Sequence, residues 1–307
     1  MDDKVTVITT VLNEEDSILT FLDSIHNQTR RPDEVIIVDG GSTDNTVKLI
    51  QSSKFTLIQK KGNRSTGRNT AIRASSNNII AVTDAGCILD TYWLERIVAP
   101  YMKKDIDVVS GFYKPLATTI FQKCLATYTC TMPDRLDKKN FLPSSRSVAF
   151  KKEAWEKVKG YPENLDTCED LVFDKRLKKA GFAFVMVPNA IVYWPQRENI
   201  FQAARQFYGY ARGDGRARYF RLSTPFLFGR YLLGVLIASY ALLTSFYLLQ
   251  AGIVVAFLGY LIWAVYKNSK YIRSWRKCIY LPLLQLVSDV AVITGTTLGF
   301  ITSLRKE

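Results

Sequence analysis

The chain has 307 residues, 48% of them apolar, and its 41 basic and 28 acidic side chains give a formal net charge of +13 at pH 7. A composition this apolar excludes an intrinsically disordered chain, and the length allows two ordinary domains or one domain with an appendage. The 5 cysteines show no CxxC spacing and there is 1 histidine, His26, so neither a disulfide framework nor a Cys/His zinc cluster is predicted. The cysteine usage fits a reduced, cytosolic setting.

The first part of the chain alternates between strand-like and helix-like patterns. The predicted strands are 5–8, 35–38, 55–58 and 79–83, and the predicted helices between them are 18–25, 46–50 and 68–74. This alternation predicts an α/β fold with a mostly parallel, doubly wound, Rossmann-like sheet. In such a sheet the ligand binds at the carboxyl ends of the strands, so the residues that follow each strand are the candidate site.

Polar segments follow three of these strands, at 10–15 (TVLNEE), 39–46 (DGGSTDNT) and 83–87 (TDAGC). Asp39 stands at a strand tip, where its carboxylate can accept hydrogen bonds from a base or a ribose. Gly40 and Gly41 then allow the backbone to approach a ligand closely. For 42–46 a helix cap and turn is an alternative interpretation that needs no ligand.

A later helix is predicted to begin at Glu169 and Asp170, because Phe173 and Leu177 fall on one side of it. Carboxylates in the first turn of a helix are favoured by the helix dipole, so capping alone would account for both. A chemical role for them therefore needs a further reason.

Four segments in this order resemble the family 2 glycosyltransferases of the GT-A fold. They are T-x-x-N-E-E at 10–15, D-G-G-S-T-D at 39–44, S-T-G-R-N at 65–69 and C-E-D at 168–170, and the resemblance covers about residues 4–220. It implies a nucleotide-diphospho-sugar transferase domain, and hence an enzyme that transfers a sugar from a nucleotide-diphosphate donor.

The resemblance also implies roles for individual residues. The expected nucleotide-binding or donor-binding residues are Thr10, Asn13, Glu15, Asp39, Gly41, Arg68 and Asp84. Within this set Asp39 would read the base and Arg68 would lie near the diphosphate. Asp84 and Asp170 are the expected catalytic residues, and Glu169 is expected on the acceptor side. Asp170 would act as the general base that deprotonates an acceptor hydroxyl during a single, inverting displacement.

The first departure from the family pattern concerns the metal. The family has D-x-D at this strand end, whereas here Asp84 is followed by Ala85 and Gly86. The expected cofactor is a divalent cation, Mg²⁺ or Mn²⁺, with Asp84 as its protein ligand and the diphosphate and water supplying the other oxygens. Without a metal, the departing diphosphate would need stabilisation by nearby cations, for which the candidates are Arg68, Arg64 and Lys61.

The second departure concerns processivity. Processive relatives carry Q-x-x-R-W, but here Gln202 and Arg205 are followed by Gln206. Together with only two or three predicted spans, this favours transfer of a single sugar. Gln202, Arg205 and the nearby Arg212 are expected on the acceptor or lipid side, although a plain turn at 210–215 is an alternative.

The carboxyl-terminal part of the chain is predicted to lie in a membrane. Residues 231–266 form a run of 36 positions without a charge, which is too long for one span of roughly 20 residues. A break near Gln250, Ala251 and Gly252 predicts a hairpin, and a third apolar stretch follows. The predicted spans are about 228–249, 251–267 and 279–303, which gives a membrane domain at 223–307 after a catalytic domain at 1–222. Three buried helices of a soluble domain are the alternative.

The distribution of basic residues predicts the orientation. Five basic residues lie between the second and third apolar stretches, namely Lys267, Lys270, Arg273, Arg276 and Lys277. The positive-inside rule therefore predicts a multi-pass protein of the cell membrane with a cytoplasmic catalytic domain. No signal peptide is predicted at the amino terminus, and Arg305 leaves the topology of the last stretch open. The segment 197–222 interleaves arginines with aromatic rings, which predicts an interfacial segment rather than a nucleic-acid site.

The sequence therefore predicts an inverting glycosyltransferase that moves one sugar to a membrane lipid-linked acceptor in glycan, glycolipid or cell-envelope polysaccharide synthesis. The expected partners are a nucleotide-sugar donor, that acceptor and the membrane, with no nucleic acid. Two alternatives stay open. One is a polyprenyl-phosphate sugar synthase, and the other is a non-catalytic, membrane-bound nucleotide-sugar binding or scaffold protein.

Overall fold

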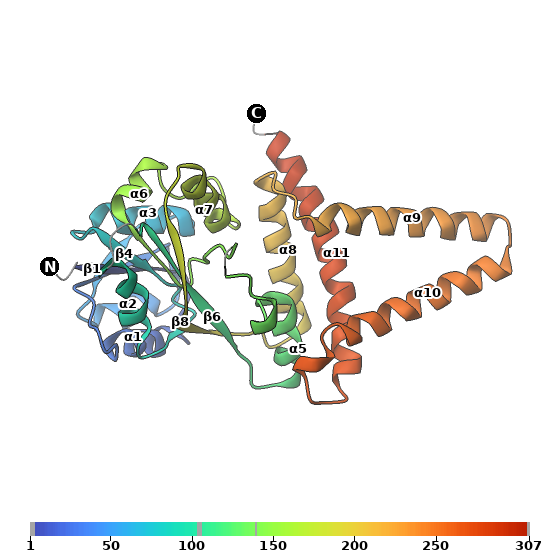
Figure 1. Cartoon of the computed structure of the whole chain (residues 1–307), viewed down its shortest axis with the longest axis horizontal. Helices are drawn as coiled ribbons and strands as arrows, with labels where there is room; N and C mark the ends of the chain where they lie inside the picture. The colour runs from blue at the N-terminus through green and yellow to red at the C-terminus, as the bar shows by residue number, and fades with distance from the viewer. Residues whose placement is uncertain (1–3, 103–105, 139, 306–307) are drawn as a thin grey trace. The chain divides into compact units, whose positions relative to one another are not determined.

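The computed structural model describes residues 4–102, 106–138 and 140–305 (Figure 1). The chain divides into two compact units. The first comprises Met1–Leu116 and Met132–Pro195, and the second comprises Ala117–Thr131 and Gln196–Glu307. The chain therefore leaves the first unit once and returns to it before entering the second unit for good.

An eight-stranded sheet forms the first unit, in the order β3-β2-β1-β4-β7-β6-β8-β5. The strands are β1 Val5–Val11, β2 Glu34–Asp39, β3 Thr56–Gln59, β4 Ile79–Val82, β5 Ile88–Leu89, β6 Val108–Leu116, β7 Val148–Lys151 and β8 Phe184–Pro195. The half β3-β2-β1-β4 is parallel throughout, with Val7 opposite Val35 and Ile8 opposite Val82. This half confirms the predicted alternation of strands and helices.

The other half of the sheet is mixed. β7 runs antiparallel to both β4 and β6, and β5 runs antiparallel to β8, while β6 and β8 are parallel. Four of the seven pairings in the described part of the chain are therefore parallel. The α/β fold class is confirmed, and the antiparallel pairings of β7 and β5 are its unpredicted part.

Six α-helices belong to the described part of the first unit. They are α1 Ile18–His26, α2 Thr46–Gln51, α3 Arg64–Ala74, α4 Trp93–Val98, α6 Lys152–Lys157 and α7 Glu169–Lys179, and two short 3₁₀ helices lie at Ala99–Met102 and Pro133–Arg135. Ala71 and Ile72 of α3 and Phe173 and Leu177 of α7 share one buried cluster with Ile8 of β1. Both helices are thus packed on the sheet through apolar residues, which fixes the polar groups they carry at the strand ends.

Gly67 lets α3 approach β1 closely. A Cβ atom at this position would lie 2.5 Å from Cγ2 of Thr10, so a larger residue would push the helix away from the strand. Asn63 caps the helix by accepting a hydrogen bond from the Thr66 backbone N–H at 3.0 Å. This cap and this contact together position Arg68, one turn inside the helix.

Five α-helices and one short 3₁₀ helix form the described part of the second unit. They are α5 Ile120–Thr129, α8 Ile200–Arg216, α9 Ser223–Leu243, α10 Tyr247–Tyr266, α11 Lys277–Leu304 and the 3₁₀ helix Ser269–Tyr271. α8 and α11 lie side by side (Figure 1). Gly295 faces α8, where a Cβ atom would lie 2.7 Å from the Tyr208 carbonyl oxygen, and Gly299 and Gly215 make similarly close approaches. Small residues at such spacing are what close helix packing requires.

The core of the second unit also includes α5. Phe121 and Leu125 of α5 pack in one buried cluster with Phe207 of α8 and Leu281 and Leu284 of α11. A hydrogen bond of 2.9 Å from the Tyr128 hydroxyl to the Leu281 carbonyl adds to this packing. A helix from the first half of the chain is therefore part of the carboxyl-terminal bundle.

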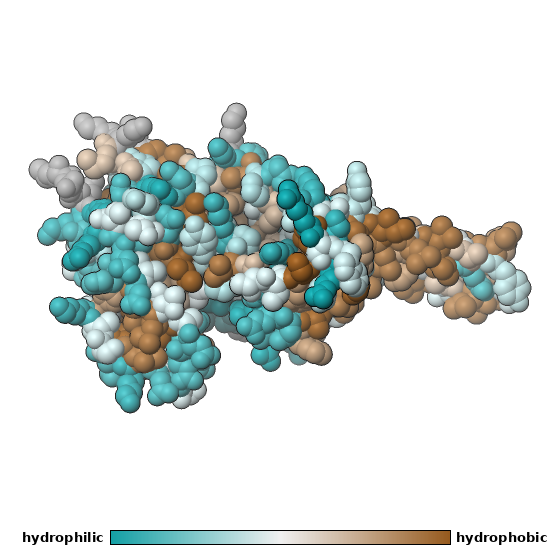
Figure 2. Space-filling model, turned by 90° about the horizontal axis from the view of Figure 1, so that it is seen from below, coloured by the Kyte–Doolittle hydropathy of each residue, from teal (hydrophilic) through white to brown (hydrophobic). Residues whose placement is uncertain are grey.

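Three helices are long and apolar enough to cross a membrane, at Ser223–Leu243, Tyr247–Tyr271 and Lys277–Leu304. The first two are almost wholly exposed, and apolar residues dominate the surface of this hairpin (Figure 2). The third is a third buried against its neighbours. Exposed apolar surface on this scale fits burial in lipid.

The hairpin turn lies at residues 244–246, so the predicted break at Gln250–Gly252 is wrong. Ser245 takes up the left-handed backbone conformation there, with φ of +48°. Gln250 instead lies within the first turn of α10, where its side-chain Nε2 donates to the Ala241 carbonyl at 3.0 Å. Gln250, whose polarity predicted a loop, therefore supplies a hydrogen bond to a backbone carbonyl in the last turn of α9.

Candidate active site

The loops after β1 and β2 are joined by side-chain hydrogen bonds. The Asn13 backbone N–H donates to Ser42 Oγ at 2.9 Å, and the Thr43 N–H donates to Asn13 Oδ1 at 2.8 Å. Glu15 Oε2 accepts from the backbone N–H and the side-chain N–H of Asn45, both at 3.0 Å. Asn13 and Glu15, two of the predicted nucleotide-binding residues, thus hold the two loops against each other. Thr10, a third, packs against Gly67.

Asp39 lies inside the turn that it opens and is only 3% exposed. Its carboxylate accepts hydrogen bonds from the backbone N–H groups of Gly41, at 3.0 Å, and Ser42, at 3.1 Å. Gly41 has a φ of +108°, a conformation that strongly favours glycine. Asp39, which is predicted to bind the base, and Gly41 therefore determine the shape of the loop after β2, where the nucleotide is predicted to bind.

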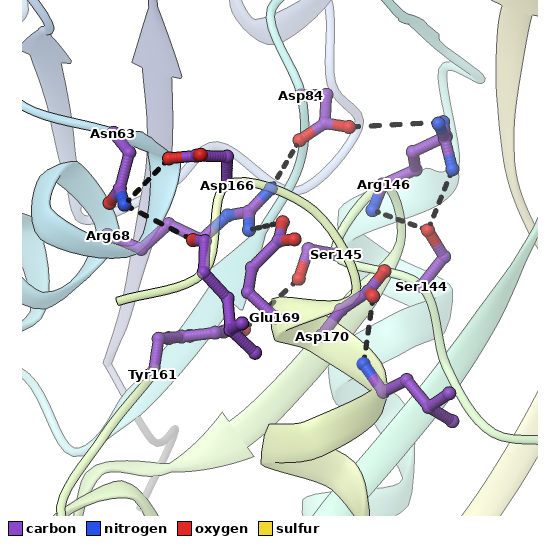
Figure 3. A network of polar contacts seen from close by, with 12 residues as sticks. Asn63, Arg68, Asp84, Ser144, Ser145, Arg146, Tyr161, Asp166, Glu169 and Asp170 are labelled. Atoms are coloured by element: carbon purple, nitrogen blue, oxygen red, sulfur yellow. Dashed lines mark hydrogen bonds and ion pairs between the residues drawn. The ribbon is translucent and has the colours of Figure 1, made fainter. Parts of the chain in front are cut away.

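An ion-pair network centred on buried Arg68 joins α3, the end of β4 and the start of α7 (Figure 3). Arg68 of α3 is 2% exposed, and its Nη1 donates to Glu169 Oε1 at 2.7 Å while its Nη2 donates to Asp84 Oδ1 at 2.8 Å. The Tyr161 ring lies under the guanidinium, 5.4 Å from ring centroid to Cζ. Charge-assisted hydrogen bonds of this length are strong, so Arg68 fixes the end of β4 and the start of α7 relative to each other.

The charges of this network are held in place by their surroundings. Burial opposes ionisation of Asp84, but the guanidinium groups of Arg68 and Arg146 outweigh it and hold the pKa of this carboxyl below its usual range. Burial also opposes the charge of Arg68, yet Asp84 and Glu169 raise its pKa above the ordinary value. Burial raises the pKa of Glu169 despite Arg68, and Asp170 adds to this effect.

Arg146 is a site residue that the sequence did not predict. It lies just before β7, with its Nε 3.9 Å from Asp84 Oδ2 and its Nη1 donating to Ser144 Oγ at 3.0 Å. Its Cζ is 3.8 Å from the centroid of the Trp194 ring on β8. A guanidinium stacked on an indole is well fixed in orientation. The only local signal is an arginine among serines before an apolar strand, which says nothing about Trp194 or Asp84.

The start of α7 sends two adjacent carboxylates in different directions. Cys168 takes up the left-handed conformation, with φ of +68°, which is rare for a residue other than glycine. Glu169 then points inward to Arg68, whereas Asp170 stays partly exposed, and its Oδ1 accepts the Leu171 N–H at 2.8 Å. Strain of this kind is often found beside functional groups. Asp170 is thus the more accessible carboxylate of the pair.

Asp174, one turn after Asp170, is buried, and its Oδ2 has no hydrogen-bond partner among the described residues. Burial raises its pKa well above the ordinary value, and the charge of Asp170 adds to this. The native state therefore holds this proton more tightly than the unfolded chain. The stabilisation is complete below about pH 4, near the unfolded pKa, and is lost as the pH rises through the folded pKa.

We expect Asp174→Asn to abolish the decrease in stability at rising pH that Asp174 causes, because the amide cannot ionise. Melting temperatures of the variant and the parent protein in detergent should agree near pH 4, and the variant should melt higher at pH 8. Asp23→Asn, an exposed carboxylate on α1, is the control and should leave the pH profile unchanged. A variant that melts lower than the parent at pH 8 would contradict the buried, protonated state.

The residues around Asp84 offer hard oxygen donors. No three His, Cys, Asp or Glu side chains within 4–102, 106–138 and 140–305 gather as a ready metal site. Glu14, however, lies beside Gly86, where a Cβ atom would be 3.9 Å from both of its carboxylate oxygens. Glu14, which the sequence did not predict as a site residue, therefore lies near the position of the missing second carboxylate. Two carboxylates fit a magnesium or manganese ion that takes its other ligands from a diphosphate and water.

Three predicted acceptor-side residues, Gln202, Arg205 and Arg212, lie on α8 in the second unit. Gln202 Oε1 accepts the Glu198 N–H at 3.0 Å, so this side chain closes the first turn of the helix. Arg205 and Arg212 are exposed. Residues 210–215 are helical, so the alternative of a plain turn there is wrong. Buried Asp214 holds this end of α8 by accepting from Arg221 Nε at 2.6 Å.

The polar loops at the carboxyl ends of β1, β2 and β4 lie where open α/β sheets bind their ligands, as in the nucleotide-diphospho-sugar transferases of the GT-A fold. Residues 6–142 match the sequence model of glycosyl transferase family 2. Over these residues the chain carries a family 2 glycosyltransferase domain, in agreement with the predicted family and enzyme class.

Two curated relatives have similar sequences. Glycosyltransferase AglE of Haloferax volcanii is 28% identical over 205 residues, which cover 63% of this chain and 67% of the relative. The O-antigen chain rhamnosyltransferase RfbN of Salmonella typhimurium is 26% identical over 216 residues, which cover 64% and 69%. The names of both relatives describe sugar transfer, in agreement with this class.

One solved structure is similar over the whole chain. The mannosyltransferase PcManGT of Pyrobaculum calidifontis, in complex with GDP-Man and Mn²⁺, superposes with a TM-score of 0.56 at 19% identity. The match covers 100% of this chain and 87% of that protein. At this identity the likeness establishes the fold.

Proposed function

We propose that this protein is an inverting glycosyltransferase that moves one sugar from a nucleotide-diphosphate donor to a membrane lipid-linked acceptor. The observation that carries the proposal is the Arg68 network, which fixes Asp84 at a strand end and Glu169 at the start of α7, and leaves the adjacent Asp170 accessible. A relative named for O-antigen chains supports a role in glycan, glycolipid or cell-envelope polysaccharide synthesis.

On the donor side, the joined loops after β1 and β2 provide a preformed edge for the nucleotide. Thr10 and the backbone around Gly41 would line it, and Asp39 would orient the turn that faces the base. Asn13 and Glu15 would act mainly by keeping the two loops together, since their side-chain oxygens already accept loop N–H groups. Such preorganisation lowers the cost of binding.

Asp84 would lie at the donor's ribose or sugar, with the diphosphate beyond it. Asp84 and Glu14 are the residues that would hold a divalent cation, which would neutralise the charge that develops on the departing diphosphate. Arg146, which stacks on Trp194 and lies 3.9 Å from Asp84, would add positive charge at the same edge. Arg68 is too deeply buried for that task and instead positions Asp84 and Glu169.

On the acceptor side, Asp170 would accept the proton of a hydroxyl group as its oxygen attacks the anomeric carbon. The bond to the nucleotide diphosphate breaks on the opposite face, so the configuration inverts. Glu169 would contribute by orienting the start of α7, because its carboxylate is committed to Arg68. We place Gln202, Arg205 and Arg212 on the acceptor or lipid side through their position on the amphipathic helix α8.

The proposed location is a membrane, with the sugar-transferring domain on its cytoplasmic side. Three helices of sufficient length and apolarity support membrane attachment. The five basic residues between α10 and the body of α11 support the orientation. The domain 1–222, with its interfacial segment 197–222, would then precede a membrane domain at 223–307.

A donor screen tests this function. Full-length protein in detergent is melted with UDP-, GDP- and dTDP-sugars, each with and without Mn²⁺ or Mg²⁺. We expect one nucleotide to raise the melting temperature, since a ligand at 100 times its Kd stabilises the native state by about 2.7 kcal/mol. The shift should grow with the metal and should be lost in Asp84→Asn.

Stabilisation by a donor without any sugar transfer would favour a non-catalytic binding protein. No shift with any donor would contradict the proposed donor site. An undiminished shift in Asp84→Asn would show that the site is not at the end of β4.

A further inference from the structure

A cluster of polar side chains lies within the apolar helices of the second unit. Asp289 of α11 is only 4% exposed and accepts hydrogen bonds from Arg230 Nη2 at 2.7 Å and the Tyr231 hydroxyl at 2.9 Å. The Tyr260 hydroxyl of α10 also donates to Asp289, and Gln285 Nε2 donates to its other oxygen at 2.9 Å. One carboxylate thus joins α9, α10 and α11.

The two charges of this cluster are exceptional for their helices. Arg230 is the only charged residue of α9, and Asp289 is the only one of α11 after its first residue. Ionisable groups in apolar spans are costly and are commonly found at sites that bind or move charged ligands. A pair that served only to hold the helices together could be replaced by apolar residues at little cost in stability.

Arg230 uses only one of its three guanidinium nitrogens for hydrogen bonds to the described residues. Its Nη2 makes both hydrogen bonds that the described residues provide, to Asp289 and to Tyr260 at 2.6 Å. Its Nε and Nη1 have no hydrogen-bond partner in the described part of the chain, and the side chain is 40% exposed. The guanidinium also lies over the rings of Tyr260 and Tyr231, with its Cζ 4.5 and 5.2 Å from their centroids. A guanidinium has five N–H donors, and each one left unmet in lipid costs several kcal/mol. Acceptor oxygens of a ligand at this position would satisfy these donors.

The position of the cluster along the predicted membrane span indicates the kind of ligand that would bind Arg230. Arg230 lies seven residues after Ser223, the start of α9, which corresponds to about 10 Å of helix. The corresponding end of α10 carries Tyr260, Trp263 and Tyr266 and is followed by Lys267. Aromatic rings next to basic residues are typical of the headgroup level of a bilayer, where lipid phosphates lie.

The local charge is favourable for an anion. Lys267 Nζ donates to Gln285 Oε1 at 2.5 Å, and Gln285 in turn contacts Asp289. Two cations therefore accompany one carboxylate in this cluster. Asp289 and the Tyr260 hydroxyl restrain Arg230 through its Nη2, while the side chain remains 40% exposed.

We propose that Arg230 binds the phosphate group of a membrane lipid, with Asp289 and Tyr260 as the positioning residues that hold its guanidinium. The phosphate oxygens would accept hydrogen bonds from Nε and Nη1, the donors without a hydrogen-bond partner among the described residues. This proposal does not depend on the sugar-transfer reaction, because it concerns binding by the second unit alone.

Native mass spectrometry of the full-length protein in detergent tests the proposal. The probes are undecaprenyl phosphate and phosphatidylglycerol, each paired with its phosphate-free analogue, undecaprenol or diacylglycerol, and inorganic phosphate is added as a competitor. We expect the phosphate-bearing lipids to bind, and Arg230→Gln to weaken binding by about tenfold or more. Arg276→Gln removes the same charge at an exposed loop position and should change binding by less than about twofold.

The arms of the experiment distinguish the sources of the phosphate. A loss in Arg230→Gln confined to undecaprenyl phosphate identifies an isoprenoid lipid, a loss confined to phosphatidylglycerol identifies a bulk headgroup, and displacement by inorganic phosphate identifies a site for the free ion. Equal binding by Arg230→Gln and the parent protein overturns the proposal. If Arg230→Gln alone fails to fold, Arg230→Gln combined with Asp289→Asn removes both charges of the pair, and unchanged lipid binding in that variant overturns the proposal as well.

Discussion

Arg68→Met is expected to lower the stability of the protein by about 3–5 kcal/mol, because it removes one partner of a buried ion pair. Glu169 and Asp84 would lose their shared guanidinium, and Glu169 is almost wholly buried. The measurement is the shift in unfolding midpoint in detergent. Arg73→Met is the matched control on the same helix, where the side chain is 60% exposed and the expected change is within about 0.5 kcal/mol.

A double variant identifies the cause of this loss. Glu169→Gln removes the charge that Arg68→Met leaves unpaired, so the two changes together should cost less than the sum of the single changes. If Arg68→Met melts like Arg73→Met, the network does not hold α3, β4 and α7 together. Strict additivity in the double variant would locate the loss elsewhere.

Asp170→Asn is expected to lower turnover by about 10²- to 10⁴-fold while donor binding stays unchanged, because an amide cannot accept the acceptor proton. The fold should persist, since Asp170 is partly exposed and its recorded hydrogen bond is to the neighbouring Leu171 N–H. Turnover and the donor-induced melting shift are measured on the same preparation. Asp166→Asn, an exposed carboxylate just before α7, is the control and should retain parental turnover.

Activity close to that of the parent protein in Asp170→Asn would identify a different acceptor. A lipid phosphate is already an anion near neutral pH and needs no base, so this result would favour a polyprenyl-phosphate sugar synthase. Loss of the donor-induced melting shift would instead place Asp170 in the donor site. The variant therefore separates a hydroxyl acceptor from a phosphate acceptor.

The parallel half of the sheet could be predicted because its signals are local. Apolar runs such as 35–38 and 79–83 each read as a buried strand, and the helices between them require parallel crossovers. The antiparallel pairings of β7 could not be predicted in this way. They join Val82 to Val148, which lie 66 positions apart in the chain, and no turn in the sequence links the two strands.

The sequence predicts many of the residues of the candidate site, but it does not predict which of them contact each other. Asp84, Arg68 and Glu169 were selected from motifs, but their spacing does not show that they share one buried ion-pair network. Arg146 and Glu14 were not predicted, because their relevance depends on Trp194, Asp84 and Gly86 being brought close by the fold. Burial decides the role of Arg68, and burial follows from packing across the whole unit.

The excursion of the chain through α5 has a consequence for biosynthesis. The Tyr128 hydroxyl bonds to the Leu281 carbonyl across 153 positions, so a nascent chain displays the apolar face of α5 long before its partner leaves the ribosome. Until then Phe121 and Leu125 have no carboxyl-terminal helix to cover them. Completion of the sheet and completion of the helical bundle are thus separate events. In the interval we expect a chaperone or the bilayer to shield this helix.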